Sequence, residues 1–395
     1  MIIKNGNIVT NTGVIEKADV LINGNRFVAP GTVLQDETVI DASDLYVCPG
    51  FVDIHTHGGG SGDFMDAEAD AFDNAIRFHS QSGTTSLVAT SVTAPVEQIT
   101  KMLSIVRQYK ACPSLPCRIL GAHIEGPYIS LKHKGAQPEQ FLRVPARDSY
   151  QFILDNRDCI KTVTIAPELD GAAEMTAALT KAGIVVCGGH DDGDKPSIMP
   201  VIEAGLSHCT HLWCTMSTVS MRDGVRNVGL CELGLTDDRL TVEFIADNHH
   251  ITPDMVKLIC KCKSADKLCI VSDCLRAGGM PVSDTLYILG RKQDAEAQRF
   301  LVSDGVARLP DGSRLAGSIQ PLSQMIRNLV VDAGVPLHDA VTMASLTPAK
   351  IIGEDGRIGS IEVGKLADIC ILDHDLNVKM TITDGKIIYD TLRTQ

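Results

Sequence analysis

Apolar positions follow two different patterns along the chain. Near the N-terminus, short β-branched runs at residues 8–10, 20–22 and 39–40 are separated by glycines that favour turns. Residues 358–389 show the same pattern and contain Asp384-Gly385, a pair that favours a tight β-hairpin. Two β-rich ends around a different middle predict one small β domain assembled from both termini.

The middle of the chain alternates strand-like apolar runs with helical stretches. Six of these runs lie at residues 86–90, 118–121, 163–166, 184–187, 242–246 and 269–272. Continuous apolar strands separated by helices are typical of a parallel sheet buried on both faces. Over roughly 300 residues they predict a (β/α)8 TIM-like barrel. An open doubly wound sheet is the competing fold, but the chain has neither a GxGxxG fingerprint nor a GxxxxGK[ST] loop.

We therefore predict an α/β protein with two structural units. Residues 1–49 and 355–395 form a discontinuous β-sandwich domain, and residues 50–354 form the barrel. Hydrophobic residues make up 44% of the chain and charged residues 22%, which is typical of a folded protein and excludes global disorder.

Charge and cysteine content narrow the class of protein further. The net charge of −13 argues against a nucleic-acid-binding protein, which needs a concentrated basic surface. No apolar run reaches the roughly 18 residues of a membrane span, and the first residues lack the pattern of a signal peptide. The 13 cysteines form no CxxC pair, so we expect most of them to be buried thiols in a reducing compartment. We expect a cytoplasmic protein with no nucleic-acid or membrane partner.

Polar residues that can bind a metal stand where apolar runs end. His55 and His57 are two residues apart on one strand, so their side chains point to the same face. Glu125 shares a face with His123 in the same way. Each feature is a weak signal alone, but five strand ends offer the same kind of ligand: His55 with His57, Glu125, His190, His211 and Asp273. Imidazole and carboxylate ligands suit zinc or iron, and barrel active sites lie at this end of the strands.

The order of these residues resembles that of the amidohydrolase superfamily, metal-dependent hydrolases with a (β/α)8 barrel and a small β domain. The similarity is closest to the N-acetylglucosamine-6-phosphate deacetylases and extends over nearly the whole chain. The segment KGAQP at residues 134–138, after the glutamate motif, is quite specific to these deacetylases, whereas GKLAD at residues 364–368 is shared more widely. The motifs lie at residues 49–58, 123–130, 134–138, 189–190, 210–212, 245–247, 315–318 and 364–368.

The resemblance implies one or two divalent cations per subunit, zinc or iron. Glu125, His190 and His211 would hold the main ion. His55 and His57 would hold a second, with Glu125 bridging the two. Asp273 would be the catalytic acid/base in the hydrolysis of an N-acetyl amide by metal-activated water.

The resemblance also implies an amino-sugar phosphate as substrate. His250 would bind the sugar phosphate, and Arg222 would reach the phosphate from the neighbouring subunit of a homodimer. N-acetylglucosamine 6-phosphate would be cleaved to glucosamine 6-phosphate and acetate. The remaining residues implied to contact substrate are Ala136, Gln137, Cys214, Thr215, Leu315, Ala316 and Gly317.

Three departures from the family pattern leave alternatives open. The family commonly has Asn-Ala where this chain has Cys214-Thr215, some members have a histidine at the position of Gln137, and a serine is usual at the position of Asp191. The alternative substrates are N-acetylgalactosamine 6-phosphate, another N-acyl compound or a cyclic amide. A catalytically silent metal-binding barrel is the alternative outside enzymes, and the complete ligand set argues against it.

Overall fold

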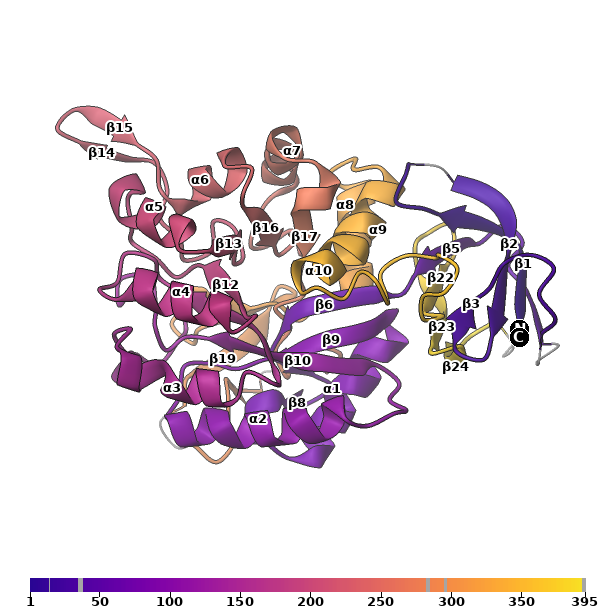
Figure 1. Cartoon of the computed structure of the whole chain (residues 1–395), viewed down its shortest axis with the longest axis horizontal. Helices are drawn as coiled ribbons and strands as arrows, with labels where there is room; N and C mark the ends of the chain where they lie inside the picture. Colours follow the sequence, from indigo (N-terminus) through magenta and orange to yellow (C-terminus); the bar gives the residue numbers. More distant parts are fainter. Residues whose placement is uncertain (14, 35–37, 282–284, 295–296, 393–395) are drawn as a thin grey trace.

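Eight parallel strands form the central sheet in this computed structural model, which describes residues 1–13, 15–34, 38–281, 285–294 and 297–392 (Figure 1). Each strand is hydrogen-bonded to the next in chain order. The strands are β6 (Phe51–Thr56), β9 (Thr84–Thr90), β10 (Arg118–Glu125), β11 (Ile160–Ile165), β12 (Val185–Gly188), β13 (Leu206–Cys209), β16 (Thr241–Phe244) and β17 (Leu268–Ile270). Every residue of β6, β9 and β17 is buried, as a parallel sheet covered on both faces requires.

Helices follow the strands and cover the outside of the sheet. They are α1 (Ala69–Gln81), α2 (Val96–Lys110), α3 (Arg147–Asp155), α4 (Ala172–Lys181), α5 (Lys195–Glu203), α6 (Leu230–Thr236), α7 (Pro253–Cys262), α8 (Leu322–Val331), α9 (Leu337–Ala344) and α10 (Leu346–Ile351). In α1 the buried residues Phe72, Ala75, Ile76 and His79 recur every three or four positions, which gives the helix one apolar face. The amide of Asp273, which follows β17, donates to the carbonyl of His55 in β6 at 2.9 Å. This bond brings the last strand beside the first.

Strands from the two ends of the chain form a second sheet beside the barrel. Its order is β24-β23-β22-β5-β1-β2-β3, with β4 also paired to β1. β5 joins the two ends, because it pairs with β1 on one side and β22 on the other. The strands are β1 (Ile2–Val9), β2 (Ile15–Asn23), β3 (Arg26–Phe27), β4 (Val39–Asp41), β5 (Tyr46–Pro49), β22 (Ile369–Leu372), β23 (Val378–Thr383) and β24 (Lys386–Asp390). Asp384-Gly385 is the turn between β23 and β24, as predicted.

The sheet has its own apolar core, which includes Ile3, Ile22 and Ile382 and is separate from the core of the barrel. The predicted fold class, a barrel with a small β domain built from both termini, is confirmed. The boundaries at residues 49 and 355 stay a prediction, and residues 393–395 lie outside the described part of the chain.

Two further groups of strands lie near the carboxyl ends of the barrel strands. β18 (Tyr287–Ile288), β19 (Arg299–Ser303), β20 (Val306–Arg308) and β21 (Leu315–Gly317) form an antiparallel sheet between β17 and α8. β14 (Ser220–Arg222) and β15 (Val225–Asn227) form a hairpin that projects from the barrel beside α5 (Figure 1). The short elements are β7 (Gly58–Gly59), β8 (Gly62–Asp63), η1 (Phe64–Asp66), η2 (Glu139–Phe141) and η3 (Ala265–Lys267). Within the described ranges, no helix has the length and apolar character needed to cross a membrane.

Candidate active site

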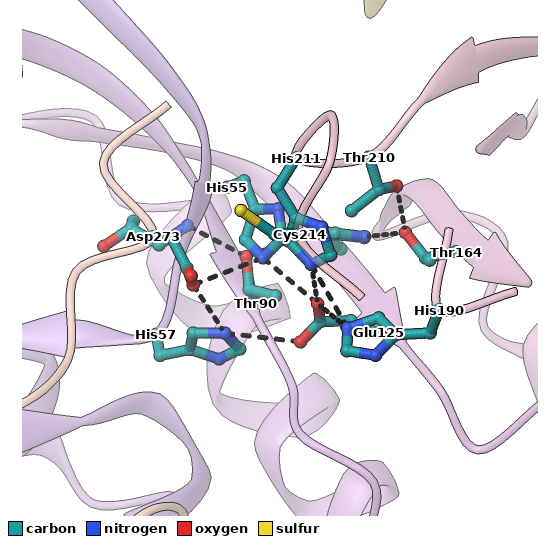
Figure 2. A network of polar contacts seen from close by, with 12 residues as sticks. His55, His57, Thr90, Glu125, Thr164, His190, Thr210, His211, Cys214 and Asp273 are labelled. Carbon is teal, nitrogen blue, oxygen red and sulfur yellow. Dashed lines mark hydrogen bonds and ion pairs between the residues drawn. The ribbon is translucent and has the colours of Figure 1, made fainter. Parts of the chain in front are cut away.

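Glu125 lies at the centre of a cluster of four imidazoles at the carboxyl ends of the strands (Figure 2). Its Oε1 is 3.1 Å from Nε2 of His211 and 3.2 Å from Nε2 of His190. The same oxygen is 3.5 Å from Nε2 of His55, and Oε2 is 3.3 Å from Nε2 of His57. The structure therefore brings together residues from β6 and the position just after it, from β10, and from the loops after β12 and β13.

The donor set of this cluster fits a divalent cation. His55 and His190 each direct Nδ1 at an oxygen, of Glu243 at 2.6 Å and of the His133 backbone at 2.8 Å. Because these oxygens accept the Nδ1 proton, each ring presents the lone pair of Nε2 to the centre. Nε2 of His190 and Nε2 of His211 are 3.1 Å apart, and Nε2 of His55 is buried without a hydrogen-bond partner. Lone pairs that converge in this way need a positive charge between them.

The electrostatics around Glu125 also favour a bound cation. Burial lowers the pKa of His55, but the carboxylates of Glu243 and Glu125 outweigh this effect and raise it to about 9, which means that a positive charge, carried by a proton or a metal ion, is favoured at its Nε2. The pKa of Glu125 is held well below its usual range because the surrounding histidines outweigh the effect of burial. The site thus attracts positive charge, and two overlapping groups can bind it: His55, His57 and Glu125, and Glu125, His190 and His211.

Asp273 lies beside the imidazole cluster on the loop after β17. Its Oδ1 is 3.2 Å from Nε2 of His57 and 3.6 Å from Nε2 of His55. Asp273, His190 and His211 all have left-handed backbone conformations, with φ of 43°, 49° and 28°. Side chains other than glycine adopt this region rarely, and such strain is concentrated at functional sites.

Glu243 is a part of the site that was not predicted from the sequence. It lies in β16, and its Oε1 accepts hydrogen bonds from His55 Nδ1 at 2.6 Å and from the amide of His211 at 3.2 Å. Its Oε2 is 3.1 Å from Nε2 of His208. The signal that could have revealed it is a charged residue inside the otherwise apolar run 242–246. His123 lies next to His55, but its ring nitrogens face the threonine hydroxyls of Thr90 and Thr164.

The cluster opens into a cavity of about 560 Å³. Most of the residues predicted to contact substrate line it: Ala136, Gln137, Cys214, Thr215, His250, Leu315, Ala316 and Gly317. The cavity is also lined by residues whose role was not predicted from the sequence: Val92, Lys132, His133, Gly135, Trp213, Leu289 and Arg314. Arg222 does not line the cavity of its own subunit, since it lies exposed on the β14–β15 hairpin and pairs with Asp194.

Gln137 is fixed at both ends of its side chain. Its Nε2 donates to Oε2 of Glu125 at 2.7 Å, and its Oε1 accepts from the amide of Thr93 at 2.7 Å. The amide therefore positions the central carboxylate at the wall of the cavity.

Asp191 holds the loop that carries Trp213, Cys214 and Thr215. Its carboxylate accepts from the amide of Ser217 at 3.0 Å and from the Ser217 hydroxyl at 2.5 Å.

Burial raises the pKa of the Cys214 thiol, so this side chain faces the cavity as a neutral group. The two departures from the family pattern, at 191 and 214, thus act on one wall of the cavity.

Comparison with known proteins identifies the family. Residues 46–388 match the amidohydrolase family. The chain belongs to the amidohydrolase family. Within it, this amidohydrolase is 34% identical over 343 residues to an N-acetylglucosamine-6-phosphate deacetylase from Vibrio furnissii, covering 87% of this chain and 82% of that one. It is also 32% identical over 342 residues to an N-acetylgalactosamine-6-phosphate deacetylase from Escherichia coli O157:H7, covering 86% and 87%.

Solved structures of deacetylases share the whole fold of this amidohydrolase. The N-acetylglucosamine-6-phosphate deacetylase from Pasteurella multocida superposes with a TM-score of 0.89 at 29% identity, covering 98% of both chains. A mutant deacetylase from Mycobacterium smegmatis, in complex with N-acetyl-D-glucosamine-6-phosphate, superposes with a TM-score of 0.88 at 31% identity, covering 98% of this chain and 99% of that one.

Proposed function

We propose that this amidohydrolase hydrolyses the acetyl amide of N-acetylglucosamine 6-phosphate to glucosamine 6-phosphate and acetate. The observation that carries the proposal is the arrangement of four histidines around Glu125, with Asp273 3.2 Å from His57, beside a cavity of about 560 Å³. That volume lies in the range of small-molecule sites. Deacetylases of such sugar phosphates are about a third identical to this chain over most of its length.

The residues around Glu125 would hold one or two divalent cations. Glu125, His190 and His211 supply one ligand group, and His55 and His57 supply a second that shares Glu125. The chemistry that such a cation supplies is Lewis acidity, which polarises a carbonyl and lowers the pKa of a coordinated water. Zinc and iron(II) both suit these ligands.

Asp273 is the group that we assign to proton transfer. Its carboxylate takes a proton from the attacking water as the new C–O bond forms at the acetyl carbon. It returns that proton to the amide nitrogen as the C–N bond breaks, which releases the amine and acetic acid. The acid then ionises to acetate. Asp273 suits this role because it lines the cavity and lies next to His57.

N-acetylgalactosamine 6-phosphate is a second candidate substrate. The chain is 32% identical to a deacetylase of that sugar phosphate and 34% identical to one of the gluco form, so similarity does not separate the two. Cys214 and Thr215 line the cavity where the deacetylases commonly carry Asn-Ala, which gives the sugar pocket its own shape.

The test is acetate release from four compounds by the metal-loaded enzyme, with Asp273→Asn as the inactive control. The compounds are N-acetylglucosamine 6-phosphate, N-acetylgalactosamine 6-phosphate, unphosphorylated N-acetylglucosamine and N-acetylglycine. A separate assay follows the ring opening of a cyclic amide. We expect a phosphorylated hexosamine to give the highest kcat/KM. Hydrolysis of another amide, with neither sugar phosphate turned over, would show that the proposed substrate class is wrong.

The active form that we propose is a homodimer in the cytoplasm. Met221 and Val225 on the β14–β15 hairpin are 66% and 61% exposed, which is a high exposure for apolar side chains and fits burial against a second subunit. The hairpin would then carry Arg222 to the partner's cavity. All 13 cysteines are free thiols, which fits a reducing compartment. Sedimentation of the purified protein measures the oligomeric state directly.

A further inference from the structure

The cavity has a deep acidic end and an outer basic end. Among the described residues that line it, the only carboxylates are Glu125 and Asp273, which are 2% and 8% exposed. The other charged lining residues are Lys132 and Arg314, both exposed. A substrate whose two ends differ in charge would be oriented by this separation.

Most of the basic residues near the entrance are already neutralised. Nζ of Lys132 lies 2.6 Å from Oδ1 of Asp192, and Nε2 of His133 lies 3.3 Å from the same oxygen. Arg222, which lies outside this cavity on the β14–β15 hairpin, pairs with Asp194. Arg314 differs, since no carboxylate in the described ranges comes within ion-pair distance of its guanidinium.

The β20–β21 hairpin sets the position of Arg314. The amide of Leu309 donates to the carbonyl of Arg314 at 3.0 Å, which closes the turn just before β21. The next three residues, 315–317, line the cavity. Arg308 pairs with Leu315 across the hairpin and likewise has no ion pair with a described residue.

Arg308 does not line the cavity itself, but it lies opposite Leu315, which does. Its positive charge acts on His250, whose Nδ1 is 2.8 Å from Oδ2 of Asp247. Because Asp247 accepts the Nδ1 proton, the ring of His250 is held against the cavity wall that it lines. One guanidinium without an ion pair to a described residue, that of Arg314, and one oriented imidazole, that of His250, thus line the same cavity, and Arg308 lies across the hairpin from the lining residue Leu315.

We propose that Arg314, together with Arg308 and His250, binds the phosphate of the substrate within the same subunit. The inference rests on the proposed function, because it names the group that recognises one end of that substrate. A guanidinium presents a planar pair of donors that matches two phosphate oxygens, which makes arginine better suited than lysine to this contact. Binding of the phosphate at the outer end would leave the acetyl group at the deep end, beside Glu125 and Asp273.

The experiment compares kcat and KM of wild-type enzyme, Arg314→Gln and the matched control Arg299→Gln. Arg299 lies exposed on β19 of the same sheet and does not line the cavity. Each enzyme is assayed on the phosphorylated and the unphosphorylated N-acetylhexosamine.

For Arg314→Gln we expect KM for the sugar phosphate to rise about 10- to 100-fold, as for loss of a charged hydrogen bond, with kcat changed less than about threefold. The kcat/KM for the unphosphorylated sugar should stay at the wild-type value, and Arg308→Gln should give a smaller rise in the same direction.

The outcomes separate the inference from the proposed function. Wild-type enzyme that hydrolyses neither sugar contradicts the proposed function. Wild-type enzyme that prefers the phosphorylated sugar, with Arg314→Gln indistinguishable from Arg299→Gln, overturns the inference alone. Equal losses by Arg314→Gln on both sugars also overturn it, because they would mean that the side chain supports the fold and not the phosphate.

Discussion

Glu243 accepts a hydrogen bond of 2.6 Å from Nδ1 of His55 although the two residues are 188 positions apart in the chain. The bond fixes the ring so that Nε2 faces Glu125. The same carboxylate accepts from the amide of His211, so one buried side chain orients both ligand groups.

We expect Glu243→Gln to weaken cation binding by about 10- to 100-fold, as for loss of a carboxylate that orients a metal-binding histidine. The measurement is the metal content of the purified variant and its retention of metal against a chelator. Glu203→Gln removes an exposed glutamate and is the matched control. A variant that keeps the wild-type affinity while it folds normally would show that Glu243 supports only the strand.

Asp273→Asn should lower kcat by about 10²- to 10⁴-fold, the usual effect of losing a general acid/base. An amide has nearly the same shape as the carboxylate but cannot accept and return the proton. Substrate KM and metal content should stay close to wild type, because Glu125 and the four histidines are unchanged. Steady-state kinetics with metal analysis of the same sample tests this, and full activity in the variant would rule out the mechanism.

Removal of metal should abolish hydrolysis and lower the melting temperature. The cation binds only the folded arrangement around Glu125, so its loss removes the stabilisation that binding adds to the native state. Activity and melting temperature should return when zinc or iron(II) is added to wild-type protein. Glu125→Gln should not recover activity, because Glu125 is the ligand that both metal-binding groups share. Unchanged activity of metal-free protein, confirmed by metal analysis, would contradict the proposal.

The strands and the strand-end ligands were predictable because they depend on local pattern. Each of the six apolar runs overlaps a barrel strand, and the i, i+2 spacing of His55 and His57 places both rings on one face. Glu243 was not assigned, because its role comes from contacts with His55 and His211 that the fold creates over long distances in the chain. Arg314 was missed for a related reason, since its neighbourhood depends on a hairpin that folds back onto the cavity.

A half-buried carboxylate, that of Glu168 on the loop after β11, should make stability depend on pH. Burial raises the pKa of Glu168 to about 7, and the nearby charge of Asp191 acts in the same direction against the hydrogen bond from the amide of Asp192. Between its ordinary pKa of 4.5 and about 7, the folded protein keeps a proton that the unfolded chain has released. The stabilisation that comes from the raised pKa of Glu168 is therefore complete below pH 4.5 and lost as the pH rises through 7.

Glu168→Gln removes this dependence while Oε1 can still accept from Asp192. We expect the variant to gain on the order of 1 kcal/mol in free energy of unfolding over wild type at pH 8 and nothing at pH 4.5, where Glu168 is protonated in the folded protein. Denaturant unfolding at the two values measures it, with exposed Glu174→Gln as the control. Parallel stability curves for wild type and variant would show that Glu168 ionises at its ordinary pKa in the folded protein.

Mixing two impaired variants tests whether Arg222 acts on the partner's cavity. Arg222→Gln and Asp273→Asn should each be weakly active at low concentrations of the sugar phosphate, for different reasons. In a mixed dimer, one cavity combines intact Asp273 with an intact Arg222 from the other subunit. Random exchange of equal amounts gives half mixed dimers, so about a quarter of all cavities should regain wild-type kcat/KM.

The matched control mixes wild-type protein with a double variant that carries Arg222→Gln and Asp273→Asn on the same chain. If the arginine acts across the interface, intact cavities in this mixture arise only from wild-type dimers. Activity that does not rise when the two single variants are mixed and exchanged would place Arg222 outside the partner's site. In that case the phosphate would depend on the arginines of the β20–β21 hairpin alone, and Arg222→Gln by itself should leave KM unchanged.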